Sequence, residues 1–345
     1  MPVQRIKISE FLENTKDHLL LDVRSPAEFE HAHIPGALNL PLFSNDERKI
    51  VGTTYKQQSR EQAIKAGLDF FGPKMRPMVE TVEQLLNSRS EVYLYCWRGG
   101  MRSAGVAWLL DLYGFKVYSL AGGYKSYRKF IIESFSKSYP FKIIGGYTGS
   151  GKTEILRALK HKGENVVDLE DLAHHKGSAF GGIGMPAAPS QEMFENRLGM
   201  CLGELSLSEG YIWLEDESQR IGNVNIPAGV WKSMRNSEVV FVDIPFAERL
   251  DYITNEYGSC TVDRLIEAVE RIRKRLGGLD AKNCIEFLQQ RNYKEAFSIL
   301  LKYYDKQYEK ALYNREQPEE LIVKLPFEKV SVNNALMLKN KIHTL

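Results

Sequence analysis

Short apolar runs alternate with longer amphipathic stretches over the first third of the chain. The apolar runs are residues 19–23, 37–40, 92–95 and 116–120. Runs of this length predict buried strands, and the stretches between them carry helical spacing. Strands that alternate with helices form mainly parallel sheets covered on both faces. The pattern therefore predicts an α/β domain over residues 1–135.

The same alternation resumes after a polar stretch that ends at Pro140. The strands that it predicts are residues 141–145, 166–169, 211–214, 239–242 and 321–324. Most of the remaining C-terminal sequence has helical spacing. We therefore expect a second α/β domain over residues 138–345, with a helical C-terminal region.

Composition limits the class of protein further. Hydrophobic residues make up 43% and charged residues 26% of the 345 residues, as in ordinary globular proteins. No apolar run reaches the roughly 18 residues of a membrane span, and the N-terminus lacks a signal-peptide core. The four cysteines have neither zinc-site nor disulfide-framework spacing. We expect a cytoplasmic protein without a membrane partner. The net charge of +2 is too small to require an anionic partner.

One cysteine begins an unusual loop of the first domain. Cys96 follows the predicted strand 92–95 and precedes Trp-Arg-Gly-Gly-Met-Arg-Ser, after which an apolar helical run begins. Backbone N–H groups at such a strand-to-helix turn converge on the sulfur, and Arg98 and Arg102 add positive charge. Both effects favour the reactive thiolate. The alternative is a small core residue that ends a buried strand, and the polarity of the loop argues against it.

Residues 146–153, Gly-Tyr-Thr-Gly-Ser-Gly-Lys-Thr, fit the phosphate-binding pattern G-x-x-x-x-G-K-[ST] between a predicted strand and a helical run. Glycines let the backbone amides face phosphate oxygens, Lys152 reaches the terminal phosphates, and the Thr153 hydroxyl holds Mg²⁺. We predict a phosphorylated or pyrophosphorylated ligand, whose identity the loop does not fix. The predicted phosphate-binding residues are Gly146, Gly149, Ser150, Gly151, Lys152 and Thr153.

Two acidic clusters are candidates for the magnesium site. Asp168 ends one predicted strand, and residues 215–217, Glu-Asp-Glu, end another. Carboxylates at the C-terminal ends of parallel strands line the crevice of an open sheet, where they can hold Mg²⁺ or its waters. Solvated loop carboxylates are the alternative for each cluster. The candidate metal ligands are Thr153, Asp168 and Asp216.

Residues 178–189 form a flexible, largely uncharged stretch rich in glycine and proline. It suits a lid over an apolar substrate, which would exclude water from the reacting centre. It equally suits a linker between helices. The sequence leaves both interpretations open.

A basic helical face lies in the C-terminal region. Arg264, Arg271 and Arg275 recur at helical spacing and are candidate RNA-binding residues. Lysines and tyrosines interleave over residues 293–313, a combination that suits an RNA with unstacked bases. The alternative is a solvated, self-paired face, since Glu267–Arg271 and Glu270–Lys274 have good i,i+4 orientation.

The first domain resembles rhodaneses. The resemblance rests on residues 21–29, Leu-Asp-Val-Arg-Ser-Pro-Ala-Glu-Phe, on residues 33–37, His-Ile-Pro-Gly-Ala, on the Cys96 loop, and on residues 120–124, Leu-Ala-Gly-Gly-Tyr. Joined to a phosphate-binding-loop domain, this pattern is similar to the bacterial tRNA 2-selenouridine synthase family. Further stretches match that family, including residues 51–58, 214–218 and 275–278. The resemblance covers nearly the whole chain and is least specific after about residue 280.

The resemblance implies an activity: replacement of sulfur by selenium in 2-thiouridine at the tRNA wobble position. It implies two steps, S-geranylation from geranyl diphosphate and then selenation from selenophosphate. Cys96 would carry the selenium, while Arg98 and Arg102 would receive the phosphate of selenophosphate. The phosphate loop with Mg²⁺ would hold the diphosphate. No tightly bound organic cofactor is expected.

Two other functions compete with this interpretation. One is an ATP-dependent tRNA sulfurtransferase, in which the second domain activates uridine and Cys96 passes sulfur. The other is a rhodanese module that regulates a P-loop kinase. The sequence does not fix which tRNAs are used, whether the loop binds geranyl diphosphate, ATP or both, or how the base moves between sites. It also leaves the oligomeric state open, and a monomer is compatible with it.

Overall fold

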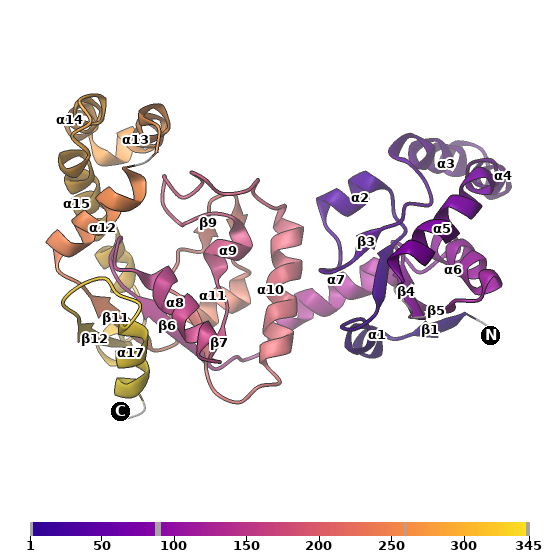
Figure 1. Ribbon diagram of the computed structural model, residues 1–345, viewed down its shortest axis with the longest axis horizontal. Helices are drawn as coiled ribbons and strands as arrows, with labels where there is room; N and C mark the ends of the chain where they lie inside the picture. Colours follow the sequence, from indigo (N-terminus) through magenta and orange to yellow (C-terminus); the bar gives the residue numbers. More distant parts are fainter. Residues whose placement is uncertain (1–2, 87–90, 259, 343–345) are drawn as a thin grey trace. The chain divides into compact units, whose positions relative to one another are not determined.

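The chain forms two compact α/β units. The computed structural model describes residues 3–86, 91–258 and 260–342. The first unit consists of the chain up to Ser134 together with Glu195–Met200, and the second of Phe135–Phe194 and the chain from Cys201 onward. Each unit contains its own five-stranded sheet with helices beside it (Figure 1). The predicted α/β class is confirmed.

The first sheet has the strand order β1-β5-β4-β2-β3, and all neighbouring strands run parallel. Its strands are β1 Gln4–Ile6, β2 Leu19–Asp22, β3 Leu38–Asn39, β4 Glu91–Tyr95 and β5 Lys116–Leu120. The four apolar runs thus form the strands that they predict. The sequence did not reveal β1, because three residues with a single buried side chain give no periodic signal.

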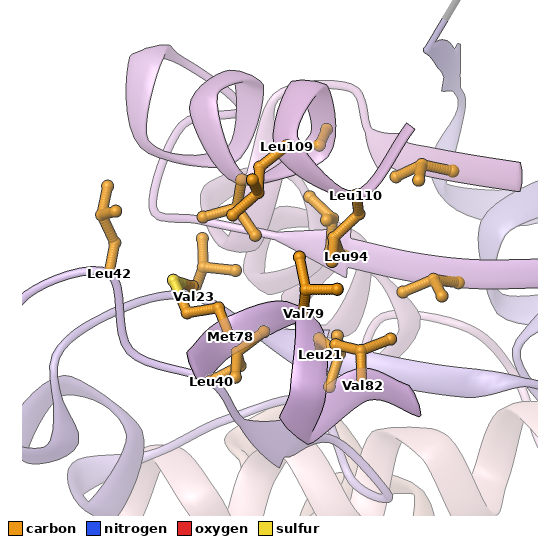
Figure 2. Close-up of a cluster of buried hydrophobic side chains, with 14 of the residues drawn as sticks. Leu21, Val23, Leu40, Leu42, Met78, Val79, Val82, Leu94, Leu109 and Leu110 are labelled. Carbon is orange, nitrogen blue, oxygen red and sulfur yellow. The ribbon is translucent and has the colours of Figure 1, made fainter. Parts of the chain in front are cut away.

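Helices cover both faces of this sheet. They are α1 Ile8–Asn14, α2 Pro26–His31, α3 Asn45–Gln57, α4 Arg60–Phe71, α5 Met75–Leu85, α6 Met101–Tyr113 and α7 Gly123–Ser134. On one face, α5 and α6 direct Val79, Val82 and Leu110 toward Leu21 and Leu94 of the strands (Figure 2). Alternate residues of β4 point the other way, where Tyr93 meets Phe11 of α1.

A short segment from the second half of the chain completes the first unit. It belongs to α10, Gln191–Leu205. The fully buried Asn196 donates from Nδ2 to the Tyr124 hydroxyl at 2.8 Å and to the His33 carbonyl at 2.8 Å. Arg128 donates to the Asn196 Oδ1 at 2.6 Å. These bonds satisfy a buried amide that would otherwise be costly.

The second sheet has the order β12-β11-β6-β8-β7, again with parallel neighbours. Its strands are β6 Phe141–Gly145, β7 Asn165–Val166, β8 Ile212–Glu215, β11 Val239–Asp243 and β12 Ile322–Pro326. All five overlap the predicted ranges, but β7 is shorter than predicted. The chain turns into helix α9 at Leu169, so residues 166–169 are not one strand. A small antiparallel hairpin, β9 Arg220–Ile221 with β10 Val224–Asn225, is additional.

The helices of this unit form two groups. The helices near the sheet are α8 Lys152–His161, α9 Leu169–Ala173, α10, α11 Ala228–Arg235, α16 Pro318–Leu321 and α17 Asn334–Ile342. The helical C-terminal region contains α12 Phe246–Tyr257, α13 Val262–Leu276, α14 Gly278–Gln289 and α15 Tyr293–Leu312, and Figure 1 shows α13, α14 and α15 gathered together. A separate apolar core joins these helices. Among the described helices, none has both the length and the apolar character needed to cross a membrane.

Candidate functional site

Cys96 lies where β4 ends and the loop to α6 begins. The side chain is buried, and its thiol donates to the Ser103 Oγ at 3.2 Å. The Ser103 hydroxyl in turn donates to the Gly100 carbonyl at 3.1 Å. After ionisation, the sulfur would accept a hydrogen bond from this same hydroxyl. The first turn of α6 therefore supplies a built-in partner for the thiolate.

The surroundings of Cys96 favour its ionised form. Burial by itself raises the pKa of the thiol, because it removes water from the charged state. Hydrogen bonds from the Ser103 hydroxyl and from the backbone N–H groups of Ser103 and Arg98, with the charge of Arg102, outweigh burial. The pKa of Cys96 therefore lies below its ordinary value. The described structure agrees with the expected activation but adds Ser103 as its main polar partner.

The loop after Cys96 is held against the first turn of α7 and the glycine-rich turn before it. The N–H of Tyr124 donates to the Cys96 carbonyl at 2.8 Å, and Lys125 donates to the Trp97 carbonyl at 3.0 Å. Gly99 has a φ of +62°, and a Cβ there would lie 2.8 Å from the Leu120 carbonyl oxygen. Only glycine fits this approach without moving backbone. The two glycine-rich turns thus depend on each other.

The two predicted loop arginines have different partners. Arg102 donates from Nη1 to Glu28 at 2.7 Å and from Nη2 to the other oxygen of the same carboxylate at 3.3 Å. Its guanidinium therefore ties α6 to α2 and is already paired. Arg98 is exposed and makes no ion pair with any described residue. Of the two, Arg98 is better placed to meet an incoming anion.

The phosphate-binding loop connects β6 to α8. Lys152 Nζ donates to the Gly146 carbonyl at 2.8 Å, so the lysine folds back over the loop. Gly146 leaves no room for a side chain, since a Cβ there would overlap the Ser150 Oγ. Ser150 Oγ is buried and has no hydrogen-bond partner within the described structure. An unpaired buried hydroxyl in this loop is what a phosphate oxygen would satisfy.

Helix α15 braces the loop from outside the motif. The Tyr308 hydroxyl accepts from the Gly146 N–H at 3.0 Å and donates to Asp216 Oδ2 at 2.9 Å. Arg249 of α12 donates to the Thr148 carbonyl at 3.1 Å and binds Asp305 of α15 with two bonds of 2.9 and 2.8 Å. The loop is thus preorganised by helices far away in sequence.

Asp216 binds other side chains of the protein through both carboxylate oxygens. Its second oxygen, Oδ1, pairs with the buried guanidinium of Arg315, while Oδ2 accepts from Tyr308. Both oxygens therefore already have partners. Asp168 caps α9, accepting from the Asp171 N–H at 2.8 Å, and does not line the cavity beside the loop. These contacts argue against both aspartates as direct metal ligands.

Glutamates take the positions beside Thr153 instead. The Thr153 hydroxyl donates to Glu170 Oε2 at 3.1 Å, and the Glu170 N–H donates to Glu215 at 2.8 Å. Glu170 is two residues beyond Asp168, but sequence alone does not reveal that the helix begins at Leu169 and turns it toward the loop. Burial, with the negative charge of Asp168, holds the pKa of Glu215 well above its usual range.

Burial and neighbouring carboxylates disfavour the charged forms of Glu215 and Glu217. Burial and the charge of Glu170 raise the pKa of Glu217 to about 8, and Glu215 Oε2 is buried with no hydrogen-bond partner. A divalent cation would relieve this repulsion. No described group of three carboxylate, histidine or cysteine side chains forms a ready-made metal site. The residues therefore fit Mg²⁺ that draws most ligands from phosphates and water, as Mg²⁺ commonly does.

A cavity of about 640 Å³ opens beside the loop. Its lining includes polar groups, among them the loop, Glu170 and Glu217. It also includes apolar and aromatic residues, namely Trp231, Tyr252, Ile253, Tyr257 and Tyr304. The volume suits a small-molecule ligand, for which cavities of roughly 300–1,000 Å³ are typical. No local sequence pattern predicts these aromatic lining residues, because they come from three separate helices.

Arg271 and Arg275 line a second cavity of about 770 Å³, whereas Arg264 lies outside it. Neither of the two i,i+4 ion pairs suggested by the sequence is formed by the described residues. Arg271 Nε donates to the Glu267 carbonyl at 3.4 Å and not to its carboxylate. Glu270 pairs with Arg273, so the expected Glu270–Lys274 pair is replaced.

Comparisons with known proteins identify both units. A family model described as the tRNA 2-selenouridine synthase AAA domain matches residues 139–331, and a rhodanese-like domain model matches residues 7–130. The chain belongs to the tRNA 2-selenouridine synthase family. The resemblance suggested by its motifs is thereby confirmed.

This chain matches different shares of the length of its relatives in this family. A tRNA 2-selenouridine synthase of Shewanella piezotolerans is 34% identical over 90% of this chain and 93% of the relative. The proteins of that name from Nitrosomonas eutropha and Nitrosomonas europaea are 40% and 42% identical over 70% of this chain. This chain spans 64% of the length of each Nitrosomonas relative.

In this family member, the stretch 178–189 contributes to both cavities. Ser178 lines both of them, and Ala179, Gly182, Pro186 and Ala188 line the second. The Ala179 N–H donates to the Tyr304 hydroxyl at 3.2 Å, which fastens the stretch to α15. The sequence did not decide between a lid and a linker for this stretch. In the structure, the stretch forms part of the wall of the cavities.

Proposed function

We propose that this protein converts 2-thiouridine at the wobble position of tRNA to 2-selenouridine, by S-geranylation followed by selenation. One observation carries the proposal: the phosphate-binding loop and several aromatic residues line the same cavity of the second unit. A diphosphate bearing an apolar chain matches both kinds of lining residue. The names of the relatives support tRNA as the substrate.

The first step would take place in the cavity beside the loop. The sulfur of 2-thiouridine attacks the first carbon of the geranyl group, the carbon–oxygen bond breaks, and diphosphate leaves. Lys152, the loop amides and the unpaired Ser150 hydroxyl would stabilise the departing charge. Thr153, with Glu170 acting directly or through water, would hold Mg²⁺, which would neutralise the diphosphate. Aromatic residues of the cavity lining would bind the geranyl chain and exclude water.

The second step would use the first unit. Alkylation turns a thiocarbonyl sulfur, which is difficult to expel, into a thioether that can leave C2 as a thiol. Cys96 is the group that would act as the nucleophile of this step, since the pKa of its thiol is lowered and it lies in a loop rich in backbone donors. Its thiolate would attack the phosphorus of selenophosphate and break the P–Se bond. The released selenide would attack C2, the C2–S bond would break, geranyl thiol would leave, and water would hydrolyse the phosphocysteine. Arg98 would meet the phosphate of selenophosphate. Arg102, already bound to Glu28, would act mainly by fixing α6.

The test is nucleoside mass analysis of 2-thiouridine tRNA incubated with geranyl diphosphate, Mg²⁺ and selenophosphate. We expect Lys152→Ala to abolish geranylation and Cys96→Ala to leave geranylated tRNA accumulating. Lys160→Ala, an exposed lysine of α8, and Cys201→Ala serve as matched controls. Loss of geranylation in Cys96→Ala would refute the two-site division. A requirement for ATP, with no use of geranyl diphosphate, would instead favour a tRNA sulfurtransferase.

A further inference from the structure

The second cavity of the P-loop unit is strongly basic. Arg220, Arg271 and Arg275 line it, and no aspartate or glutamate occurs among its described lining residues. None of these arginines forms an ion pair within the described part of the chain. Arg220 donates from Nε to the Gly222 carbonyl at 3.0 Å, and Arg271 donates from Nε to the Glu267 carbonyl. Unneutralised guanidinium groups around one cavity indicate an anionic ligand.

Only some of the arginines of helix α13 line the second cavity. Arg271 and Arg275 are four residues apart and therefore lie on the same side of the helix. Arg273, between them, pairs with Glu270 and does not line the cavity. Arg273 thus has a carboxylate partner on its own helix, whereas Arg271 and Arg275, which line the cavity, have none among the described residues.

The cavity also offers groups that recognise nucleotides. Tyr303 of α15 lies half-buried in its wall, so that a ring is available for stacking with an unpaired base. Ser218 and Asn223 supply hydroxyl and amide groups suited to ribose or base edges. Arginine, aromatic and amide groups together favour RNA over a simple phosphate.

The second cavity adjoins the first. Gly177, Ser178, Ser218 and Tyr304 line both of them. A chain molecule bound in the basic cavity can therefore place one of its groups beside the phosphate loop. A single-stranded RNA has this property, because a base can turn away from the backbone that carries it.

We propose that the second cavity binds the tRNA backbone next to the target nucleotide, so that the 2-thiouracil base enters the P-loop cavity. Arg271 and Arg275 bind phosphates, Arg220 adds a third cationic contact, and Tyr303 stacks with a neighbouring base. This inference rests on the proposed function, because it gives that function's RNA substrate a specific site.

The experiment measures binding of an anticodon stem–loop RNA containing 2-thiouridine to the full-length protein by fluorescence anisotropy at several salt concentrations. The double variant Arg271→Gln/Arg275→Gln removes both charges. We expect its Kd to rise about tenfold or more at low salt, and the slope of log K against log salt to fall by roughly 2. Arg271→Lys/Arg275→Lys should recover most of the affinity, because a phosphate accepts either cation.

Arg273→Gln is the matched control, since it changes the same helix without removing a cavity residue. Geranyl diphosphate binding by the double variant, measured by calorimetry, should be unchanged. Equal RNA affinity in the double variant and Arg273→Gln would overturn the site assignment but leave the proposed function intact. A wild-type protein that binds no RNA and makes no modified nucleoside would overturn both. Competition by an acidic peptide for the arginines, without RNA binding, would assign the cavity to a protein partner and refute the RNA site.

Discussion

At the scale of single residues, the reactivity of Cys96 depends on neighbours in the loop that follows it and in the first turn of α6. Burial works against the thiolate, and the Ser103 hydroxyl and loop amides work for it. Arg102 lowers the pKa of Cys96 through its charge alone, and its guanidinium is bound to Glu28. Ser103 is therefore the residue whose removal should alter Cys96 most cleanly.

We predict that Ser103→Ala raises the pKa of Cys96, because it removes the hydroxyl that stabilises the thiolate. The rate of iodoacetamide alkylation, followed against pH, should reach its midpoint at higher pH than in the wild-type protein. Ser59→Ala, which removes a hydroxyl from the N-terminus of α4, is the control. An unchanged alkylation midpoint in Ser103→Ala would contradict the role given to this hydroxyl.

At the scale of elements, both candidate sites use the same construction. A buried strand, β4 or β6, ends in a glycine-rich loop, and a helix begins directly after it. In each case, the backbone amides and the positive end of a helix face one small region. The second site differs because α12 and α15 also brace its loop through Arg249 and Tyr308.

We predict that Tyr308→Phe weakens diphosphate binding about fivefold, because a hydrogen bond worth about 1 kcal/mol no longer orders Gly146. Calorimetric titration with geranyl diphosphate provides the measurement. Tyr293→Phe, at the start of the same helix, should bind like the wild-type protein. Cys96 alkylation should be unaffected in both variants. Wild-type affinity in Tyr308→Phe would show that the motif orders itself without α15.

At the scale of the whole molecule, a nearly neutral chain separates its charges into local regions. The net charge is only +2, yet buried and half-buried carboxylates gather beside Thr153 while arginines without ion pairs among the described residues line the neighbouring cavity. Buried carboxylates with raised pKa values make folding depend on pH. Their protonated forms are favoured in the folded state, so their stabilising contribution is present at low pH and is lost as pH rises.

We predict that Glu217→Gln makes the second unit less sensitive to pH. The folded pKa of about 8 exceeds the ordinary 4.5, so stability associated with Glu217 falls as pH rises from about 4.5 through 8. The midpoint of thermal unfolding should therefore decline less between pH 5 and 8 in the variant. Glu328→Gln, at an exposed position, should retain the wild-type profile. A Glu217→Gln profile identical to that of the wild-type protein would contradict the raised pKa.

The sequence by itself determined whatever depends on adjacent residues. Strands such as 116–120 and 141–145, the Cys96 loop and the phosphate loop are local patterns, and a few consecutive side chains are enough to specify each of them. Their chemical types also indicated a thiol site and a phosphate-binding site. The family followed from their combination.

The tertiary structure decided which distant side chains meet. Gly146 and Tyr308 are 162 positions apart, and Asp216 and Arg315 are 99 apart, so no local pattern announces either contact. The start of α9 turned Glu170 toward Thr153, and Arg271 donates to the carbonyl of Glu267 and not to the carboxylate expected as its partner. Local sequence fixes backbone conformation and chemical type, whereas burial and charge pairing depend on contacts that exist only after the chain has folded.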